Sequence, residues 1–509
     1  MKLFKIFLVS LLTINSPVLA EPLVYQLLDV EPTDWAYEAL LYLVEKYGCI
    51  AGYPDQTFGG NRVLTRYEFA AGLNSCLNSL ASIDSTDIET IKRLQTDFQP
   101  ELQSVKSKVE TLETRVSTLE DQNFSTTVKL FGLVTLNLMG ATGSERADGS
   151  GSISTNPAFM YTGLLSFNAS FTGTDQLTIS LYSANQTPID ELVTGTDMTR
   201  IGIFDLGFND QVVIGDLVYR FNVTKNLHIT IDAVGGQFTD SVSQAYGGPL
   251  TPFIFAPYNS SISRFGVVDP AYYQILFRPG VVAVQSLGDR VFLGAGYFGN
   301  SSNSNDPNQG FFGTYAAAAQ VTGVVTEKFI VTLLYINAYD EDTSVSLSGE
   351  TSSAFANQPF GTTPTSSNHV SLGFGWTVTP KLVIHGDTSF GFATAKSDYT
   401  FDGNNNINGF AGVKGDNATI VQWNLGISLL DLFGEGNVGS IVLGNPYKVI
   451  DHSRRDGENS TAWHLEASYK YQLNDNIYFQ SGYLIVLNPE NNSDNSAVGT
   501  WIFKTVFSF

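Results

Sequence analysis

The chain has 509 residues, and its 49 acidic side chains outnumber its 27 basic ones, giving a formal net charge of −22. This excess argues against nucleic-acid binding, because a nucleic-acid binder neutralises phosphates with lysine and arginine. Charged residues make up 15% of the chain and aromatic residues 12%, whereas about 25% of an ordinary globular protein is charged. Such a composition agrees with a membrane-embedded protein.

Residues 1–20 predict a secretory signal peptide. Lys2 and Lys5 precede an apolar run over residues 6–14, and a small-residue cleavage site ends at Ala20. The run is too short to span a bilayer, and no later window offers about eighteen uninterrupted apolar residues, so no transmembrane helix is expected. We therefore expect an exported chain that begins near Glu21.

Residues 23–82 show a compact helical pattern. Trp35 lies in an amphipathic segment with an acidic first turn, and residues 52–55, Gly-Tyr-Pro-Asp, indicate a turn. Thr65 and Glu68 have the spacing of a capping box at the start of a second helix. Cys49 and Cys76 either pair in an oxidising periplasm or are two small buried hydrophobic residues, and the sequence leaves both open.

This segment resembles one S-layer homology (SLH) module. The matching positions are Asp29, Val30, Trp35, Ala36, Gly52, Tyr53, Pro54, Asp55, Phe58, Thr65, Arg66, Glu68 and Phe69. The resemblance implies binding of an anionic polysaccharide attached to peptidoglycan, with Arg66 on the sugar carboxylate and Trp35 and Gly52 shaping the groove. The planar, permanently charged fork of arginine suits a carboxylate. The alternatives are that Arg66 pairs with an acid on its own helix and that Trp35 fills the core.

Residues 88–122 predict a coiled-coil helix. Apolar residues recur at spacings of three and four, and they are Ile91, Leu94, Phe98, Leu102, Val105, Val109, Leu112, Val116 and Leu119. The step from Phe98 to Leu102, next to Pro100, indicates a stutter. Valine at a and leucine at d favour two strands. The barrel predicted below nevertheless favours a homotrimer, which would also supply three SLH modules. The alternative is a single helix on the periplasmic rim of the barrel.

Residues 126–509 predict a transmembrane antiparallel β-barrel, so the fold class is mainly β. In the clearest strand, one face holds Trp463, Leu465, Ala467, Tyr469 and Tyr471, and the other holds His464, Glu466, Ser468 and Lys470. The chain ends on a similar strand, with Trp501, Phe503, Phe507 and Phe509 opposite Lys504 and Ser508. A terminal aromatic residue is the usual ending of an outer-membrane barrel, so Phe509 is a candidate barrel-assembly signal.

The number of strands follows from turns and loops. Tight turns are predicted at residues 172–175, 224–226, 287–289, 326–328, 379–381, 433–436 and 473–476. Long polar stretches lie between the hairpins, at residues 300–310, 346–368, 402–417 and 488–496. Seven hairpins, an opening strand at 127–138 and a closing strand at 498–509 make about sixteen strands. Such a barrel encloses an aqueous channel, and an even count puts both of its ends on the periplasmic side.

The third long loop, residues 235–270, is the predicted constriction, because the third external loop of general porins folds into the lumen. It carries Gln237, Asp240, Gln244, Tyr246, Tyr258, Arg264 and Asp269, a mixture that suits hydrogen bonding of hydrated solutes. The alternative is a solvated surface loop. Strand alternation adds lumen candidates, which either solvate the wall or bind solutes: Asp216, Arg220, His228, Asp232, His385 and Asp387.

The whole layout resembles the cyanobacterial outer-membrane porins, whose barrels are grouped with the OprB-type carbohydrate-selective porins and some of which are labelled iron-uptake porins. The likeness is strongest in the first hundred residues and at Ser263–Gly266. There the family run usually continues with a basic pair and Asn-Pro, whereas this chain has Val267-Val268-Asp269-Pro270. The departure removes the basis for carrying over an anion preference, and Asp269 would favour cations.

Catalysis is not expected. The five histidines lie far apart without a metal-ligand spacing, and no nucleophile elbow or Walker loop is present. We expect no cofactor and no metal. The sequence leaves a passive pore for ions and small hydrophilic solutes, held to peptidoglycan by the SLH module, or mainly a structural tether between outer membrane and peptidoglycan. About sixteen strands favour the pore, because a tether needs only about eight.

Overall fold

The computed structural model describes residues 35–47, 69–71, 73–74, 77, 87–104, 128–202, 210–246, 261–300, 304–308, 310–341, 345–398 and 412–509. The predicted signal peptide, Cys49 and Cys76 lie outside these ranges. The chain divides into two compact units, Met1–Phe124 and Ser125–Phe509, and each is described by itself.

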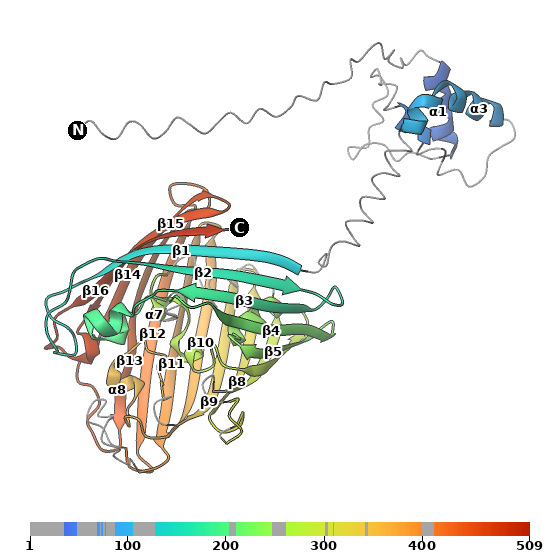
Figure 1. Cartoon of the computed structure of the whole chain (residues 1–509). Helices are drawn as coiled ribbons and strands as arrows, with labels where there is room; N and C mark the ends of the chain where they lie inside the picture. The colour runs from blue at the N-terminus through green and yellow to red at the C-terminus, as the bar shows by residue number, and fades with distance from the viewer. Residues whose placement is uncertain are drawn as a thin grey trace, which may run out of the picture. The chain divides into compact units, whose positions relative to one another are not determined.

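The second unit is a closed antiparallel barrel of 16 strands (Figure 1). Each strand pairs with its neighbours in chain order, and the first pairs with the last to close the cylinder. The strands are β1 (Val128–Thr142), β2 (Ala158–Ala169), β3 (Gln176–Ala184), β4 (Val213–Thr224), β5 (Leu227–Val234), β6 (Gly280–Leu287), β7 (Val291–Gly299), β8 (Tyr315–Thr326), β9 (Phe329–Asp340), β10 (Thr365–Thr379), β11 (Leu382–Ala395), β12 (Asn417–Leu430), β13 (Val438–His452), β14 (Trp463–Asn474), β15 (Ile477–Leu487) and β16 (Val498–Ser508).

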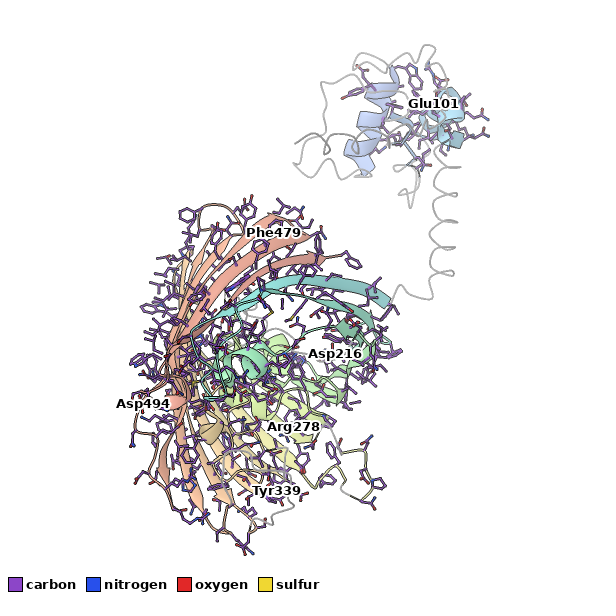
Figure 2. The ribbon with its side chains drawn as sticks, turned by 60° about the vertical axis from the view of Figure 1, so that its left-hand side comes forward. Glu101, Asp216, Arg278, Tyr339, Phe479 and Asp494 are labelled. Atoms are coloured by element: carbon purple, nitrogen blue, oxygen red, sulfur yellow. The ribbon has the colours of Figure 1, made fainter. Side chains whose placement is uncertain are left out.

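The predicted strand count is confirmed. Each of the seven predicted turns joins two consecutive strands, and residues 475–476 alone connect β14 to β15. The long loops emerge from the opposite end, as Phe479 near a tight turn and Tyr339 near a long loop illustrate (Figure 2). The stretch predicted over residues 346–368 ends earlier, because β10 already begins at Thr365.

Alternation along the strands separates an outer face from a lumen face. On β14, the residues Trp463 and Leu465 are 40% and 39% exposed, whereas His464 and Glu466 are 0% and 3% exposed. The predicted division of this strand is therefore confirmed. Burial on the lumen side means that other parts of the chain cover the inner wall, since an open, wide lumen would leave these side chains accessible.

The seam between β1 and β16 continues to Phe509, the residue after β16. The Phe509 N–H donates to the Gly132 carbonyl oxygen at 3.0 Å, and the Gly132 N–H donates to the Phe509 carbonyl oxygen at 2.7 Å. A Cβ atom on Gly132 would lie 2.4 Å from the Phe509 ring. Glycine at this position therefore makes room for the terminal aromatic ring on the closing seam.

The first unit has a small helical core. Helix α1 (Trp35–Tyr47) packs Leu40 and Leu43 against Phe69 and against residues of α3 (Ile88–Asp97). The Lys46 Nζ atom lies 2.7 Å from Asp87 Oδ2, which joins the end of α1 to the start of α3.

The described part of this unit does not support a coiled coil. Ile91, Leu94 and Phe98, the first residues of the predicted seam, are buried against α1 of the same chain. Their apolar spacing therefore reflects a core within one chain in this segment. Helix α3 ends at Asp97, and residues 99–104 are helical again after a turn at Phe98. Residues 105–127 lie outside the described ranges. In the part of the chain that the structure describes, no helix is both long and apolar enough to cross a bilayer.

Candidate pore constriction

Loop L3 (residues 235–279) joins β5 to β6 and packs against the inner wall. Its described parts contain α5 (Phe238–Tyr246), α7 (Arg264–Val267) and the 3₁₀ turn η3 (Pro270–Gln274). Apolar side chains from all three parts share one buried cluster with lumen-facing residues of β6, β7, β8 and β9. The wall therefore holds L3 by hydrophobic burial over several strands, which excludes a loop that lies wholly in solvent.

Glu466 on β14 fastens the middle of L3. Its carboxylate accepts hydrogen bonds from the backbone N–H groups of Ile262 at 2.6 Å and Ser263 at 3.2 Å, and from Ser261 Oγ at 3.1 Å. Ser263 Oγ also lies 3.2 Å from Nε2 of the buried His464. A buried carboxylate is stable only when hydrogen-bond donors surround it. Residues 261–263 supply these donors, and the carboxylate in turn holds this stretch of L3 against β14.

Asp269 fastens the next part of L3 to β10 and β12. Its carboxylate accepts hydrogen bonds from Ser371 Oγ and from Gln422 Nε2 at 3.3 Å, and it caps η3 by accepting from the Ala271 N–H at 2.9 Å. Burial raises the pKa of the Asp269 carboxyl above its usual range. Tyr272 Oη then donates to Gln320 Oε1 of β8 at 2.6 Å. Residues 261–272 of L3 thus follow the inner wall from β14 to β8.

Loop L2 (residues 185–212) pairs with L3 through backbone hydrogen bonds. The Gly202 N–H donates to the Ile262 carbonyl oxygen at 2.8 Å, and the Arg264 N–H donates to the Arg200 carbonyl oxygen at 2.9 Å. A Cβ atom on Gly202 would lie 2.8 Å from the Ser263 carbonyl oxygen, so glycine allows this approach. The pairing brings two arginines together at the edge of L3.

The two arginines belong to a cluster of L2, L3 and loop L5 (residues 341–364). The Arg264 guanidinium lies 4.0 Å from the centre of the Tyr273 ring, and its Nε donates to the Gly349 carbonyl oxygen at 2.8 Å. Arg200 pairs with Glu350 of L5 and lies 3.8 Å from Glu191 of L2. We call these side chains the constriction cluster: Glu191, Arg200, Arg264, Tyr273 and Glu350.

Two acids of the constriction cluster face solvent. The Glu191 side chain is 55% exposed and the Glu350 side chain 43%, whereas Arg200 is only 10% exposed. Asp190, Glu191 and Asp197 also bring carboxylate oxygens within 4.8 Å of one another. Arg200 Nε lies 3.4 Å from Asp190 Oδ2, so arginine supplies the counter-charge at this acidic group.

A second connection joins three long loops. Glu490, in the loop L8 (residues 488–497), accepts from Thr196 Oγ1 of L2 at 2.5 Å and from the Ala354 N–H of L5 at 2.7 Å. Burial raises the pKa of Glu490 to about 7, and the nearby carboxylates of Glu458 and Asp148 act in the same direction. Protonation at this junction is therefore sensitive to pH near neutrality.

Four predicted lumen residues meet beside α5. Asp216 and Arg220 lie on the lumen side of β4, Asp232 on that of β5, and Asp240 in the first turn of α5 (Figure 2 labels Asp216). Burial raises the pKa of Asp240; Arg220 opposes that shift and Asp216 adds to it. Tyr182 Oη donates to Asp216 at 3.0 Å. The arrangement is an acidic patch with one arginine.

The other predicted site residues lie apart from these clusters. Asp387 on β11 accepts from Gln422 Nε2 at 2.6 Å, in the same wall network as Asp269. In the first unit, Trp35 is half-buried in α1, and the Arg93 guanidinium lies 3.8 Å from the centre of its ring. Gly52, Arg66 and Tyr258 lie outside the described residues.

Sequence reasoning did not single out Arg200, Glu350 or Glu466 as site residues. Glu466 could have been predicted as a lumen residue from the sequence, since alternation on β14 puts this acid on the lumen face. Arg200 and Glu350 lie in long loops without any periodic pattern, and only the folded arrangement brings them together.

Comparison with known proteins agrees with this geometry. Residues 85–509 match the family described as carbohydrate-selective porin, OprB family, and residues 27–70 match the S-layer homology domain. The uncharacterized protein sll0772 of Synechocystis sp. is 37% identical over 513 residues, which cover 96% of this chain and 90% of that protein. The uncharacterized protein alr4550 of Nostoc sp. is 32% identical over 524 residues, which cover 96% and 85%.

A solved structure supports the barrel. OprB of Pseudomonas putida, in a structure at high pH, superposes with a TM-score of 0.51 at 9% sequence identity. The superposition covers 77% of this chain and 96% of that one. At this level of identity the likeness concerns the fold.

Proposed function

Because this chain belongs to the OprB family of carbohydrate-selective porins and lies in the outer membrane, we propose that it is a pore for passive diffusion of ions and small hydrophilic solutes. The observation that carries the proposal is the course of L3, which Glu466, Asp269 and Tyr272 fasten along the inner wall of a 16-strand barrel. A fixed loop narrows a lumen without energy input, so pore width and wall charge decide which solutes pass.

We place the selective step at the constriction cluster. Arg264 presents a planar donor group held on Tyr273, and Glu350 and Glu191 present exposed acceptors. Neighbouring donors and acceptors can replace part of the water around a hydroxylated solute such as a carbohydrate. Asp216, Arg220, Asp232 and Asp240 provide a further charged surface along the proposed path, while Asp269 and Asp387 hold the wall network together.

The SLH module is proposed to anchor the barrel to a peptidoglycan-linked anionic polysaccharide, with Arg66, Trp35 and Gly52 at the binding groove. A homotrimer is the proposed assembly, because three copies would present three such modules to the cell wall. The second candidate function is a tether with a narrow or closed barrel. The match of residues 27–70 to the SLH domain favours anchoring in either case.

A liposome-swelling assay tests the pore. Liposomes that contain the detergent-refolded full chain should swell in isotonic pentose or hexose, and the rate should fall steeply as the sugar becomes larger. Protein-free liposomes in the same sugars provide the baseline. Folding should be checked by the heat-dependent gel migration of barrels. Swelling no faster than the baseline, from folded protein, would leave the tether as the function.

A further inference from the structure

Two lysines lie in one row of polar side chains on the inner wall. Lys470 on β14 is the direct cross-strand partner of Gln480 on β15, which is also the partner of Lys504 on β16. Asn137 on β1 continues the row beside Lys504. Since β14 ends at Asn474 before a tight turn, the row lies near the end of the lumen that faces the periplasm.

Both lysines are buried, and neither has a counter-charge among the residues that the structure describes. Lys504 is 2% exposed and Lys470 8%, and in the described ranges no carboxylate forms an ion pair with either. The ammonium group of Lys470 instead lies 5.4 Å from the centre of the Tyr478 ring, and that of Lys504 lies 5.8 Å from the centre of the same ring. A cation–π contact stabilises an ammonium group much less than removal of that group from water destabilises it. The ring alone does not offset burial of two positive charges.

The amide between the two lysines also lacks partners. Gln480 is 0% exposed, and neither its Nε2 nor its Oε1 atom has a hydrogen-bond partner. Asn137 Nδ2 is 3.3 Å from Thr135 Oγ1, but its Oδ1 atom has no partner. A buried amide without hydrogen-bond partners destabilises the folded state. Two ammonium groups and an amide N–H₂ therefore form a set of unused donors in one place.

We propose that Lys470, Gln480 and Lys504 form a binding site for a compact oxyanion such as inorganic phosphate or sulfate. A divalent oxyanion between the lysines neutralises both charges, and its several oxygens accept from both ammonium groups and from the Gln480 amide. Chloride offers one charge and binds such a paired site less well. The site rests on the proposed pore for access to solutes, and it would concentrate oxyanions inside a chain that is otherwise strongly acidic.

Direct binding to the detergent-solubilised full chain tests the site without requiring conduction. Titration of inorganic phosphate into the protein should give a saturable heat of binding in calorimetry. Alternatively, the protein should broaden the phosphorus NMR line of phosphate. The double variant Lys470→Gln/Lys504→Gln should bind phosphate at least tenfold more weakly. The control Lys328→Gln removes an exposed lysine from the β8–β9 turn at the same end of the barrel and should bind like the unmodified protein. The variant Lys504→Arg, which keeps the charge, should retain binding.

Bilayer recordings distinguish failure of the site from failure of the pore. In potassium chloride, added phosphate or sulfate should reduce the current through the unmodified protein and through Lys328→Gln, but not through the double variant. A protein that conducts chloride but neither binds phosphate nor responds to it overturns the oxyanion site and leaves the pore intact. Equal phosphate affinity in the double variant overturns the site as well. If the double variant does not fold, the unmodified protein alone decides the question by the same binding measurement.

Discussion

Glu466 illustrates how one buried acid sets the position of a functional loop. Its side chain is 1% exposed, and its carboxylate accepts three hydrogen bonds from residues 261–263 of L3. Each buried donor left without an acceptor costs about 1–3 kcal/mol. The free energy that holds this part of L3 against β14 therefore depends strongly on one side chain.

We predict that Glu466→Ala releases this part of L3 and widens the pore. Single-channel conductance should rise and current noise should increase, because the loop gains freedom to move. Glu466→Gln keeps one acceptor oxygen and should have a smaller effect. The control Glu435→Gln changes an exposed acid in the β12–β13 turn and should leave conductance unchanged. Unaltered conductance in a folded Glu466→Ala protein would show that L3 does not define the narrowest point.

Single residues were predictable from the sequence where they belong to strands. The period of two places Asp216, Asp232 and Glu466 on lumen faces because successive side chains of a strand point to opposite sides. The period of two does not reveal that the Asp269 carboxylate accepts hydrogen bonds from Ser371 and Gln422, since these partners come from strands distant in sequence. Pairing between long loops, as for Arg200 with Glu350, has no local pattern at all.

Among the elements, the closing seam between β1 and β16 depends on the fit of the terminal ring. Gly132→Val places a branched side chain where the Phe509 ring now lies, since even a Cβ atom would come within 2.4 Å of that ring. We predict a strong loss of folded barrel in outer membranes, measured by heat-dependent gel migration. Gly323→Val is the matched control on β8, because no atom lies within 4 Å of a Cβ there.

Removal of Phe509 should have a similar effect, because its backbone forms the last pair of hydrogen bonds with Gly132. Outer-membrane levels should fall severalfold relative to the full-length chain. An unchanged level after either alteration would contradict the assignment of the terminal residue as an assembly signal.

The connection among L2, L5 and L8 should respond to pH. The pKa of Glu490 rises from 4.5 to about 7 on burial, so the connected state binds more protons than the separated one. Its stability is therefore greatest below about pH 4.5 and falls as pH rises toward 7. We predict more frequent open events at pH 8 than at pH 5 in bilayer recordings.

The variant Glu490→Gln tests whether Glu490 causes this pH response. Asp197 of L2 also has a pKa raised to about 7 by burial, so the single variant should lose part of the response and Glu490→Gln/Asp197→Asn most of it. An equal response in the double variant would assign the titration to other groups.

At the scale of the whole molecule, strand number and topology were predictable because tight turns and long loops leave clear compositional signals. The predicted coiled coil is not supported in the residues that the structure describes. Ile91, Leu94 and Phe98 have the spacing of a seam between chains, yet they pack against α1. A helix buried within its own chain and one buried against another copy produce the same apolar spacing.

The SLH module is proposed to anchor the whole molecule to the cell wall. Arg66→Ala should abolish co-sedimentation of the purified protein with cell-wall sacculi that carry the anionic polymer, because the variant loses the proposed carboxylate-binding fork. Its conductance should remain that of the unmodified protein. Undiminished sedimentation would refute the role of Arg66.

The central claim is that the barrel is an open aqueous pore. Conductance of the purified full chain across a planar bilayer tests it most directly. We predict discrete, stable steps whose size increases in proportion to salt concentration, because ions then move through water rather than over a binding barrier. A folded preparation that inserts but gives no steps at any salt concentration would contradict the pore and support the tether.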